Sequence, residues 1–255
     1  MQRINRWAML AALGVCTAVP AQADLLFTVG AKASVWNAGA DGDLDKDVSV
    51  GSDGLDIEDN TGNQLTVFFE HPVPLLPHVE LKRTSLDMSG EGSINAEFAG
   101  QDFTGDVETE FDLSHQDLTL YWGLPLPVPF VDVYVGATAR QFDGSAEVSG
   151  SYQGNTVSES VDLDLTLPLA YGAVKVSTPF GLYAGADVRY IGMGDNQLTD
   201  LSYGLGYDLP IPVVDIGLQA GYRRLALQTD PDDVDIEADV DVSGVYVGAA
   251  VSLGF

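Results

Sequence analysis

Hydrophobic and polar residues alternate over the end of the chain, from Val245 to Phe255. The apolar row consists of Val245, Val247, Ala249, Val251, Leu253 and Phe255, and the other row of Tyr246, Gly248, Ala250, Ser252 and Gly254. Because successive side chains of a strand point to opposite faces, this pattern predicts a β-strand with one apolar face. A strand of a secreted β-sandwich alternates in the same way, so this segment alone leaves both environments open.

Four further segments show the same alternation, and in each the second parity is small, polar or charged. They are residues 27–35, 131–140, 182–190 and 214–223. A barrel with lipid outside and a polar lumen inside requires this pattern, whereas a soluble barrel with a dry core would not place Arg and Asp on its inner face so consistently. The alternation therefore favours an all-β transmembrane barrel.

Short proline-containing segments without acidic residues recur along the chain, and proline falls at strand ends and turns because it cannot donate to a ladder. They are residues 72–77, 125–129, 178–181 and 210–212. Longer connections, acidic or rich in Gly, Ser and Asn, lie between them, roughly at 37–63, 89–114, 143–160, 194–199 and 229–239. Short periplasmic turns and long extracellular loops are typical of outer-membrane barrels, and these connections predict about ten antiparallel strands. Eight or twelve strands remain alternatives, because the long loops have room for hairpins of their own.

The N-terminus has the features of a secretory signal peptide. Arg3 and Arg6 precede an apolar run from Trp7 to Val19, and residues 21–23 form a small-x-small cleavage site. The run is too short to span a bilayer as a helix, which needs about 20 residues. We therefore expect residues 1–23 to be removed and residues 24–255 to form a single exported barrel domain. The only cysteine, Cys16, lies in the signal peptide, which excludes disulfides from the mature chain.

The chain resembles bacterial outer-membrane β-barrels, on the signal peptide, the architecture and the terminal strand. More narrowly it is similar to Gly-rich small barrels with Pro-x-Pro turns, a family of unassigned function. The resemblance implies an outer-membrane location in the Gram-negative envelope, contact with membrane lipids and lipopolysaccharide, and assembly by the barrel-assembly machinery, with Phe255 as its signal. It carries no catalytic or binding residues.

The formal net charge of −27 becomes −29 once Arg3 and Arg6 are removed with the signal peptide. This charge excludes nucleic acid as a natural partner. The carboxylates gather in the predicted loops, where most charge runs are solvated surface. Such loops also suit divalent cations as a secondary property, although no EF-hand or calcium-binding nonapeptide pattern is complete. No cofactor is expected, and a dedicated metal site stays unassigned.

Charged residues also fall on the inward parity of the predicted strands. The cations Lys32, Arg140, Arg189 and Arg223 are predicted to share one tier of the lumen, with the carboxylates of Glu70, Asp132, Asp187 and Asp215 below or beside them. In one interpretation cross-barrel ion pairs fill a narrow barrel, with the arginines latching acidic loops, because unpaired buried charge is costly. In the other the cations form a basic constriction that selects small anions.

Some positions depart from the alternation. We interpret Lys82 and Lys175 as snorkelling near the periplasmic interface, and the parity shift at Ser243–Gly244 as a β-bulge. Aromatic residues near the strand ends, Trp36 among them, are expected to form interfacial girdles. Inward glycines such as Gly136 leave space for a wet passage or for a folded-in loop.

Enzymatic chemistry finds little support in the sequence. Ser114 and His115 project to opposite faces of a strand, which leaves only His115 and Asp117 as a dyad, and the Asp-x-His pattern of outer-membrane aspartyl proteases is absent. We therefore expect a non-enzymatic barrel that is structural or a narrow, porin-like pore for small solutes. The alternatives are a barrel that carries hydrophobic molecules or binds lipid, and a hydrolase that uses His115 and Asp117.

Overall fold

The computed structural model describes residues 27–44, 48–51, 54–73, 75–98, 101–152, 155–194, 196–209, 211, 214–229 and 238–255. The predicted signal peptide and residues 230–237, most of the predicted last loop, lie outside these ranges. None of the described residues forms a helix long and apolar enough to cross a membrane.

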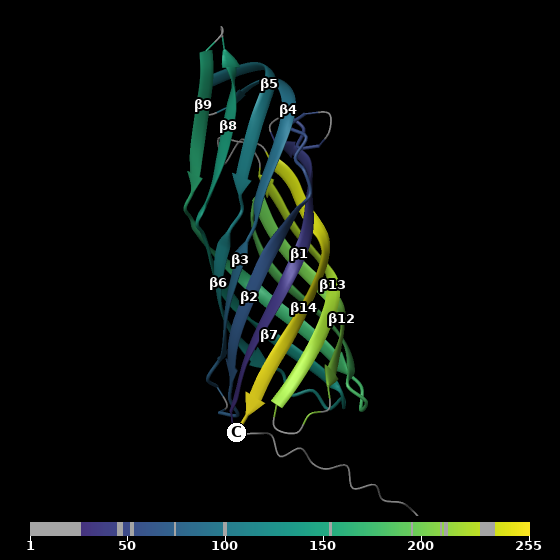
Figure 1. Cartoon of the computed structure of the whole chain (residues 1–255). Coiled ribbons are helices and arrows are strands. Elements are labelled where there is room, and N and C mark those ends of the chain that lie inside the picture. Colours follow the sequence, from purple (N-terminus) through teal and green to yellow (C-terminus); the bar gives the residue numbers. More distant parts are fainter. Residues whose placement is uncertain are drawn as a thin grey trace, which may run out of the picture.

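Ten antiparallel strands close into a barrel, which confirms the predicted fold and strand number (Figure 1). They are β1 (Thr28–Leu44), β2 (Asn60–Glu70), β3 (His78–Ser85), β6 (His115–Gly123), β7 (Val131–Phe142), β10 (Thr166–Ser177), β11 (Leu182–Met193), β12 (Asn196–Leu209), β13 (Val214–Thr229) and β14 (Ala238–Gly254). Each of these ten strands pairs with the barrel strand before it and the barrel strand after it, so that β3 pairs with β6 and β7 with β10, and β14 returns to pair with β1. Closure leaves no strand edge facing lipid, as a membrane-spanning sheet requires.

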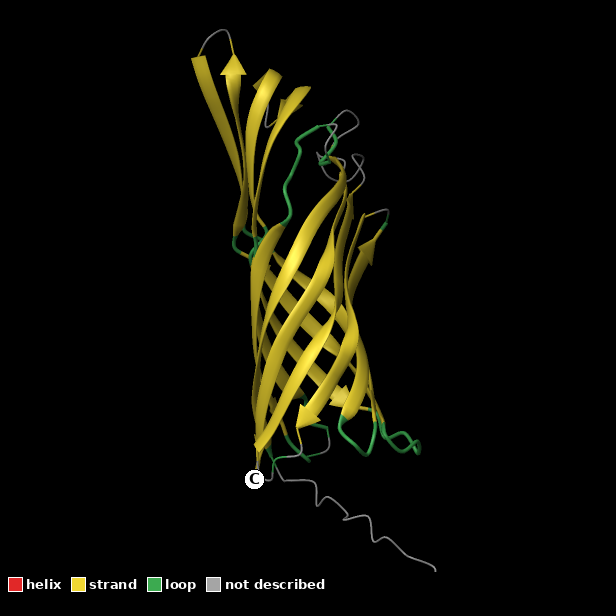
Figure 2. Cartoon of the chain, turned by 45° about the vertical axis from the view of Figure 1, so that its right-hand side comes forward, coloured by secondary structure: helices red, strands yellow, loops and turns green. Residues whose placement is uncertain are grey.

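Four further strands form a separate sheet in the order β4-β5-β8-β9, which rises from one side of the barrel at the end opposite the C-terminus (Figures 1 and 2). They are β4 (Asp87–Phe98), β5 (Gln101–Asp112), β8 (Gly144–Tyr152) and β9 (Asn155–Leu163). Only Leu86 separates β4 from β3, so this sheet continues the barrel wall. Two predicted long loops are thus hairpins, and together they form one extracellular sheet.

The outward face of the barrel carries a belt of solvent-accessible aliphatic side chains. Leu65 is 55% exposed, Leu205 68% and Val245 59%. A continuous apolar surface of this kind is expected only against lipid or another protein. On the extracellular side the belt ends at polar outward residues such as Asn63, Arg83 and Arg224.

The lumen is filled in three layers from the short-turn end upward. Tyrosines and glycines line the lowest layer, where the Tyr183 ring covers Gly206 and leaves no room for a Cβ atom there. Charged side chains form the middle layer. Above it the inward positions become apolar. Leu198 is the next inward residue above Asp200 in β12, and Leu225 the next above Arg223 in β13; both are less than a tenth exposed.

Residues 48–51 and 54–57 of the first loop close the extracellular end of this apolar layer. Val50 and Leu55 are each 2% exposed and pack in the same cluster as Trp36 and Leu86. Backbone hydrogen bonds hold the loop in place, with Val50 N donating to Gly42 O at 2.9 Å. The outer half of the lumen is therefore a packed hydrophobic core.

This apolar layer explains one wrong prediction. The pairing of β14 with β1 and β13 runs in continuous register through Ser243 and Gly244, so no bulge is present. Val242 faces inward because the lumen at its height is apolar, and it is 2% exposed. The same parity of β14 therefore faces the lumen throughout, but its inward residues change from small or polar to apolar at this height.

Three other expectations also fail. Lys82 does not snorkel but is buried in the lumen, opposite Asp117 in the β3–β6 register. Lys175 shares the inward parity with Tyr171, which pairs with Arg189. Trp36 belongs to no girdle, because its side chain is fully buried inside the barrel.

Candidate functional site: the buried ion-pair layer

The middle layer of the lumen contains the densest set of ionisable side chains in the described part of the chain. The alternation of six strands, β3, β6, β7, β11, β12 and β13, aims them inward. The cations are Lys82, Arg140, Arg189 and Arg223, and the carboxylates are Glu80, Asp117, Asp187 and Asp200. Four positive and four negative charges thus balance within the layer.

Asp200 lies at the centre of this layer and links two arginines. Its Oδ1 accepts a hydrogen bond from Arg223 Nε at 2.9 Å, and its Oδ2 accepts one from Arg223 Nη2 at 2.7 Å. Arg140 Nη2 also donates to Asp200 Oδ2. The side chains of Asp200, Arg140 and Arg223 are all fully buried. Bidentate pairs of this kind are among the strongest hydrogen bonds in proteins.

Asp117 holds Arg140 from the other side, through Arg140 Nε at 2.7 Å and Nη2 at 2.8 Å. Its Oδ2 also lies 3.4 Å from Arg189 Nε. Arg189 in turn donates to Glu80 Oε1 at 2.8 Å and to Asp187. The ion pairs therefore run across the lumen from β3 and β6 to β11, β12 and β13.

Aromatic rings complete the layer above and below. The Arg223 guanidinium lies 4.6 Å from the centroid of the Trp36 ring, and that of Arg189 lies 5.1 Å from the Tyr171 ring. Such cation–π contacts stabilise desolvated guanidinium groups. The charged layer is thus packed on its faces as well as paired within its plane.

Three of the four predicted tier cations, Arg140, Arg189 and Arg223, meet in this layer. Lys32 does not join them, because its ammonium group lies over the Phe68 ring, 5.1 Å from the centroid. These three arginines pair with carboxylates of the barrel strands, in part across the lumen, and not with the acidic loops.

The predicted lumen carboxylates are dispersed. Asp187 belongs to the layer, whereas Glu70 accepts a hydrogen bond from the Tyr121 hydroxyl at 2.8 Å. Asp132 lines a pocket at the short-turn end, and Asp215 is exposed there. Sequence reasoning missed Glu80, Lys82 and Asp200 as partners. The inward position of Lys82 could have been predicted from Glu80, because residues two apart in a strand point to the same face.

Phe255 closes the ladder at the short-turn end. Its backbone N–H and C=O exchange hydrogen bonds of 3.0 Å with Phe27, and its ring centroid lies 6.0 Å from that of Phe27. The ring is 66% exposed on the outside of the barrel. This position leaves the predicted assembly signal accessible.

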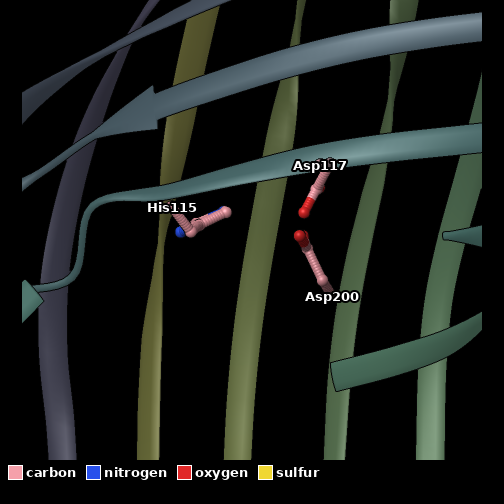
Figure 3. A group of neighbouring side chains, drawn as sticks. All are labelled: His115, Asp117 and Asp200. Atoms are coloured by element: carbon pink, nitrogen blue, oxygen red, sulfur yellow. The ribbon is translucent and has the colours of Figure 1, made fainter. Parts of the chain in front are cut away.

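His115, Asp117 and Asp200 have ligand atoms within 4.8 Å of one another, close enough to surround a metal ion (Figure 3). Their donor chemistry does not suit one. His115 Nε2 accepts from Arg223 Nη2 at 3.2 Å, and because arginine only donates, Nδ1 must carry the proton, which it gives to Leu113 O at 2.8 Å. Both carboxylates are engaged by arginines, so a cation would enter a layer that is already neutral.

The same contacts bear on catalysis. A general base needs a free lone pair within reach of its substrate. The His115 lone pair points at Arg223, and His115 and Asp117 are each 1% exposed. The dyad predicted as a hydrolase alternative thus lies inside the packed layer.

No protein-family model matches the chain, and no curated protein matches it. Among solved structures it is similar to the outer-membrane protease OmpT from Escherichia coli, with a TM-score of 0.48 and 11% identity over 89% of this chain and 97% of that one. It is also similar to the translocator domain of the autotransporter NalP from Neisseria meningitidis, with a TM-score of 0.42 and 14% identity over 89% and 88% of the two chains. Neisserial surface protein A gives a TM-score of 0.31 at 15% identity, covering 90% and 97%. At these identities the likeness concerns the barrel fold alone.

Proposed function

We propose that this outer-membrane β-barrel protein is a closed, non-enzymatic membrane anchor whose structural role is to hold the extracellular sheet at the cell surface. The carrying observation is the pair of arginines bound to Asp200, because side chains without accessible surface block the lumen at mid-height. The apolar layer above them adds a second barrier. Neither layer offers a path to a hydrated solute.

The alternatives fit these layers less well. A selective pore needs sites that a permeating ion can bind and then leave. These arginines are instead already paired with carboxylates of the barrel wall. A carrier of hydrophobic molecules needs an apolar cavity, and the apolar layer is packed by its own side chains. A hydrolase needs an accessible base, and His115 is buried.

Planar-bilayer recording of the purified, refolded protein tests the proposal. We expect no step currents, together with the heat-modifiable migration of a folded barrel in gel electrophoresis. A general porin, reconstituted in parallel, is the positive control. Single-channel steps from the wild-type protein would contradict a closed barrel, and loss of those steps in the Asp200→Asn variant would assign them to this lumen.

The enzymatic alternative has its own assay. Labelled casein and labelled phospholipid, incubated with the folded barrel, should stay uncleaved. Cleavage that disappears in the His115→Gln variant, with folding retained, would overturn the non-enzymatic proposal. Contact with lipopolysaccharide, recognition by the assembly machinery and binding of divalent cations by the acidic loops remain predictions.

A further inference from the structure

The outer surface of β1, β2, β3 and β14 contains a groove on the membrane-facing side of the barrel. It has a volume of about 380 Å³. Its apolar lining consists of the outward side chains of Ala33, Val35, Leu65 and Val247. The small side chain of Ala33, between larger aliphatic neighbours, leaves room in the wall.

Polar groups converge at the extracellular end of this groove. Asn63 and Ser85 face each other in the β2–β3 register, and Arg83 lies opposite Leu65. The groove therefore offers a guanidinium, an amide and a hydroxyl group at the upper edge of the apolar belt. Hydrophobic walls below and hydrogen-bond donors above match the two parts of a membrane lipid.

Arg83 is available for a further partner. Its side chain is 52% exposed, and its ion pair with Asp143 is loose, with 3.5 Å between Nη2 and Oδ2. Among the lysines and arginines that the structure describes, only Arg83 and Arg224 face outward, and Arg224 is closely paired with Asp241. Arg83 is thus the outward cation best placed to bind an anion.

From this geometry we infer that the groove binds one phosphorylated lipid of the outer leaflet, with an acyl chain along Ala33 and Leu65 and the phosphate on Arg83. Arginine suits this role because its planar fork of donors matches the oxygens of a phosphate. Among the described residues, the other outward cation, Arg224, is already held by Asp241. The site does not depend on whether the lumen is closed.

Native mass spectrometry of the folded barrel, released from detergent micelles, tests the site. The probes are dimyristoyl phosphatidic acid, dimyristoyl phosphatidylcholine and inorganic phosphate, titrated with EDTA present so that no divalent cation bridges the contact. We expect one retained copy of phosphatidic acid, and binding weakened about tenfold or more in Arg83→Gln, because a charge-assisted hydrogen bond is lost. Arg224→Gln, the matched outward arginine, should bind like the wild type.

Two more variants separate the parts of the site. Ala33→Phe should fill the groove and weaken phosphatidic acid binding, whereas Ala186→Phe, on the lipid face of β11, should not. Asp143→Asn should strengthen binding, since it frees Arg83 from its competitor. Each variant is first checked for heat-modifiable migration, so that loss of folding is not read as loss of binding.

Three results would overturn the inference. Equal losses in Arg83→Gln and Arg224→Gln would mean that lipids bind the belt without a specific site. If inorganic phosphate bound as tightly as phosphatidic acid, the apolar groove would contribute nothing to binding. Equal retention of phosphatidylcholine and phosphatidic acid in the wild type would remove the requirement for an anionic headgroup.

Discussion

Arg223 and Asp200 form a bidentate ion pair, with N–O distances of 2.9 and 2.7 Å, in the middle of the barrel, where neither side chain has accessible surface. Arg140 also binds Asp200, and it binds Asp117 as well. Asp200 thus connects both sides of the lumen, and its removal leaves two guanidinium groups short of a counter-charge.

Asp200→Ala should therefore lower the free energy of unfolding by about 3–5 kcal/mol, the cost of leaving buried charges unpaired. Urea titration of the refolded barrel in lipid vesicles measures it. The control is Asp241→Ala, which breaks the outer-surface pair with Arg224, whose side chain is 59% exposed. Exposed pairs contribute about 0–1 kcal/mol, so equal losses in both variants would contradict the proposed weight of the buried layer.

The two tryptophans outside the predicted signal peptide report on lumen closure from opposite sides of the wall. Trp36 is fully buried inside the barrel, whereas Trp122 is 39% exposed on its outside. In the Trp122→Phe variant, Trp36 fluorescence should resist both aqueous acrylamide and brominated lipid. In Trp36→Phe, brominated lipid should quench Trp122. Quenching of Trp36 by acrylamide in the folded barrel would show that small solutes enter the lumen.

Two inward glycines form a matched pair for testing how tightly the lower layer is packed. A Cβ at Gly136 would lie 2.1 Å from the Leu120 carbonyl oxygen, whereas the nearest atom to a Cβ at Gly185 is the Val174 oxygen at 3.4 Å. Gly136→Ala should destabilise the barrel by about 1–3 kcal/mol, as overpacking does. Gly185→Ala should change stability much less. The same urea titration compares them, and a reversed order would contradict the described wall.

The extracellular sheet places like charges opposite one another. Glu91 pairs in register with Glu108, and Glu110 with Glu147. Each such pair destabilises a sheet by up to about 1 kcal/mol, and salt screens it. Limited proteolysis of this sheet in the folded barrel should therefore slow when NaCl is raised from low to high concentration. Glu108→Gln should slow cleavage at low salt, and an unchanged rate in both tests would argue against this repulsion.

Much of the barrel was predictable from the sequence because its signals are local. Alternation, proline turns and long connections give the ten strands without knowledge of any contact. The extracellular sheet was not predictable, since pairing of β5 with β8 joins two hairpins that the barrel strands β6 and β7 separate in sequence. Alternation gives the parity of Asp200 but not its partners, which lie 23 and 60 positions away in the chain.

The other misses have separate causes. The assumption of a uniformly polar lumen made the inward, apolar Val242 look like a change of phase. The inward position of Lys82 was hidden because the next residue, Arg83, is also charged, so that the alternation does not show which of the two faces the lumen. The parity of Lys175 needed the actual register of β10 with β11. In this barrel the chemistry of an inward residue depends on its height in the lumen. That height depends on the stagger between neighbouring strands, which the sequence of a single strand does not give.

The seam of the barrel joins its two longest strands, β1 and β14, each of 17 residues, and pairs Thr28 with Gly254. Contacts between residues so distant in sequence are slow to form, because a long loop must close before they are gained. Until β14 arrives, β1 keeps one edge open and able to pair with other chains. During folding, the free edge of β1 is therefore the part of the barrel most open to mispairing, and it stays so until the final strand arrives.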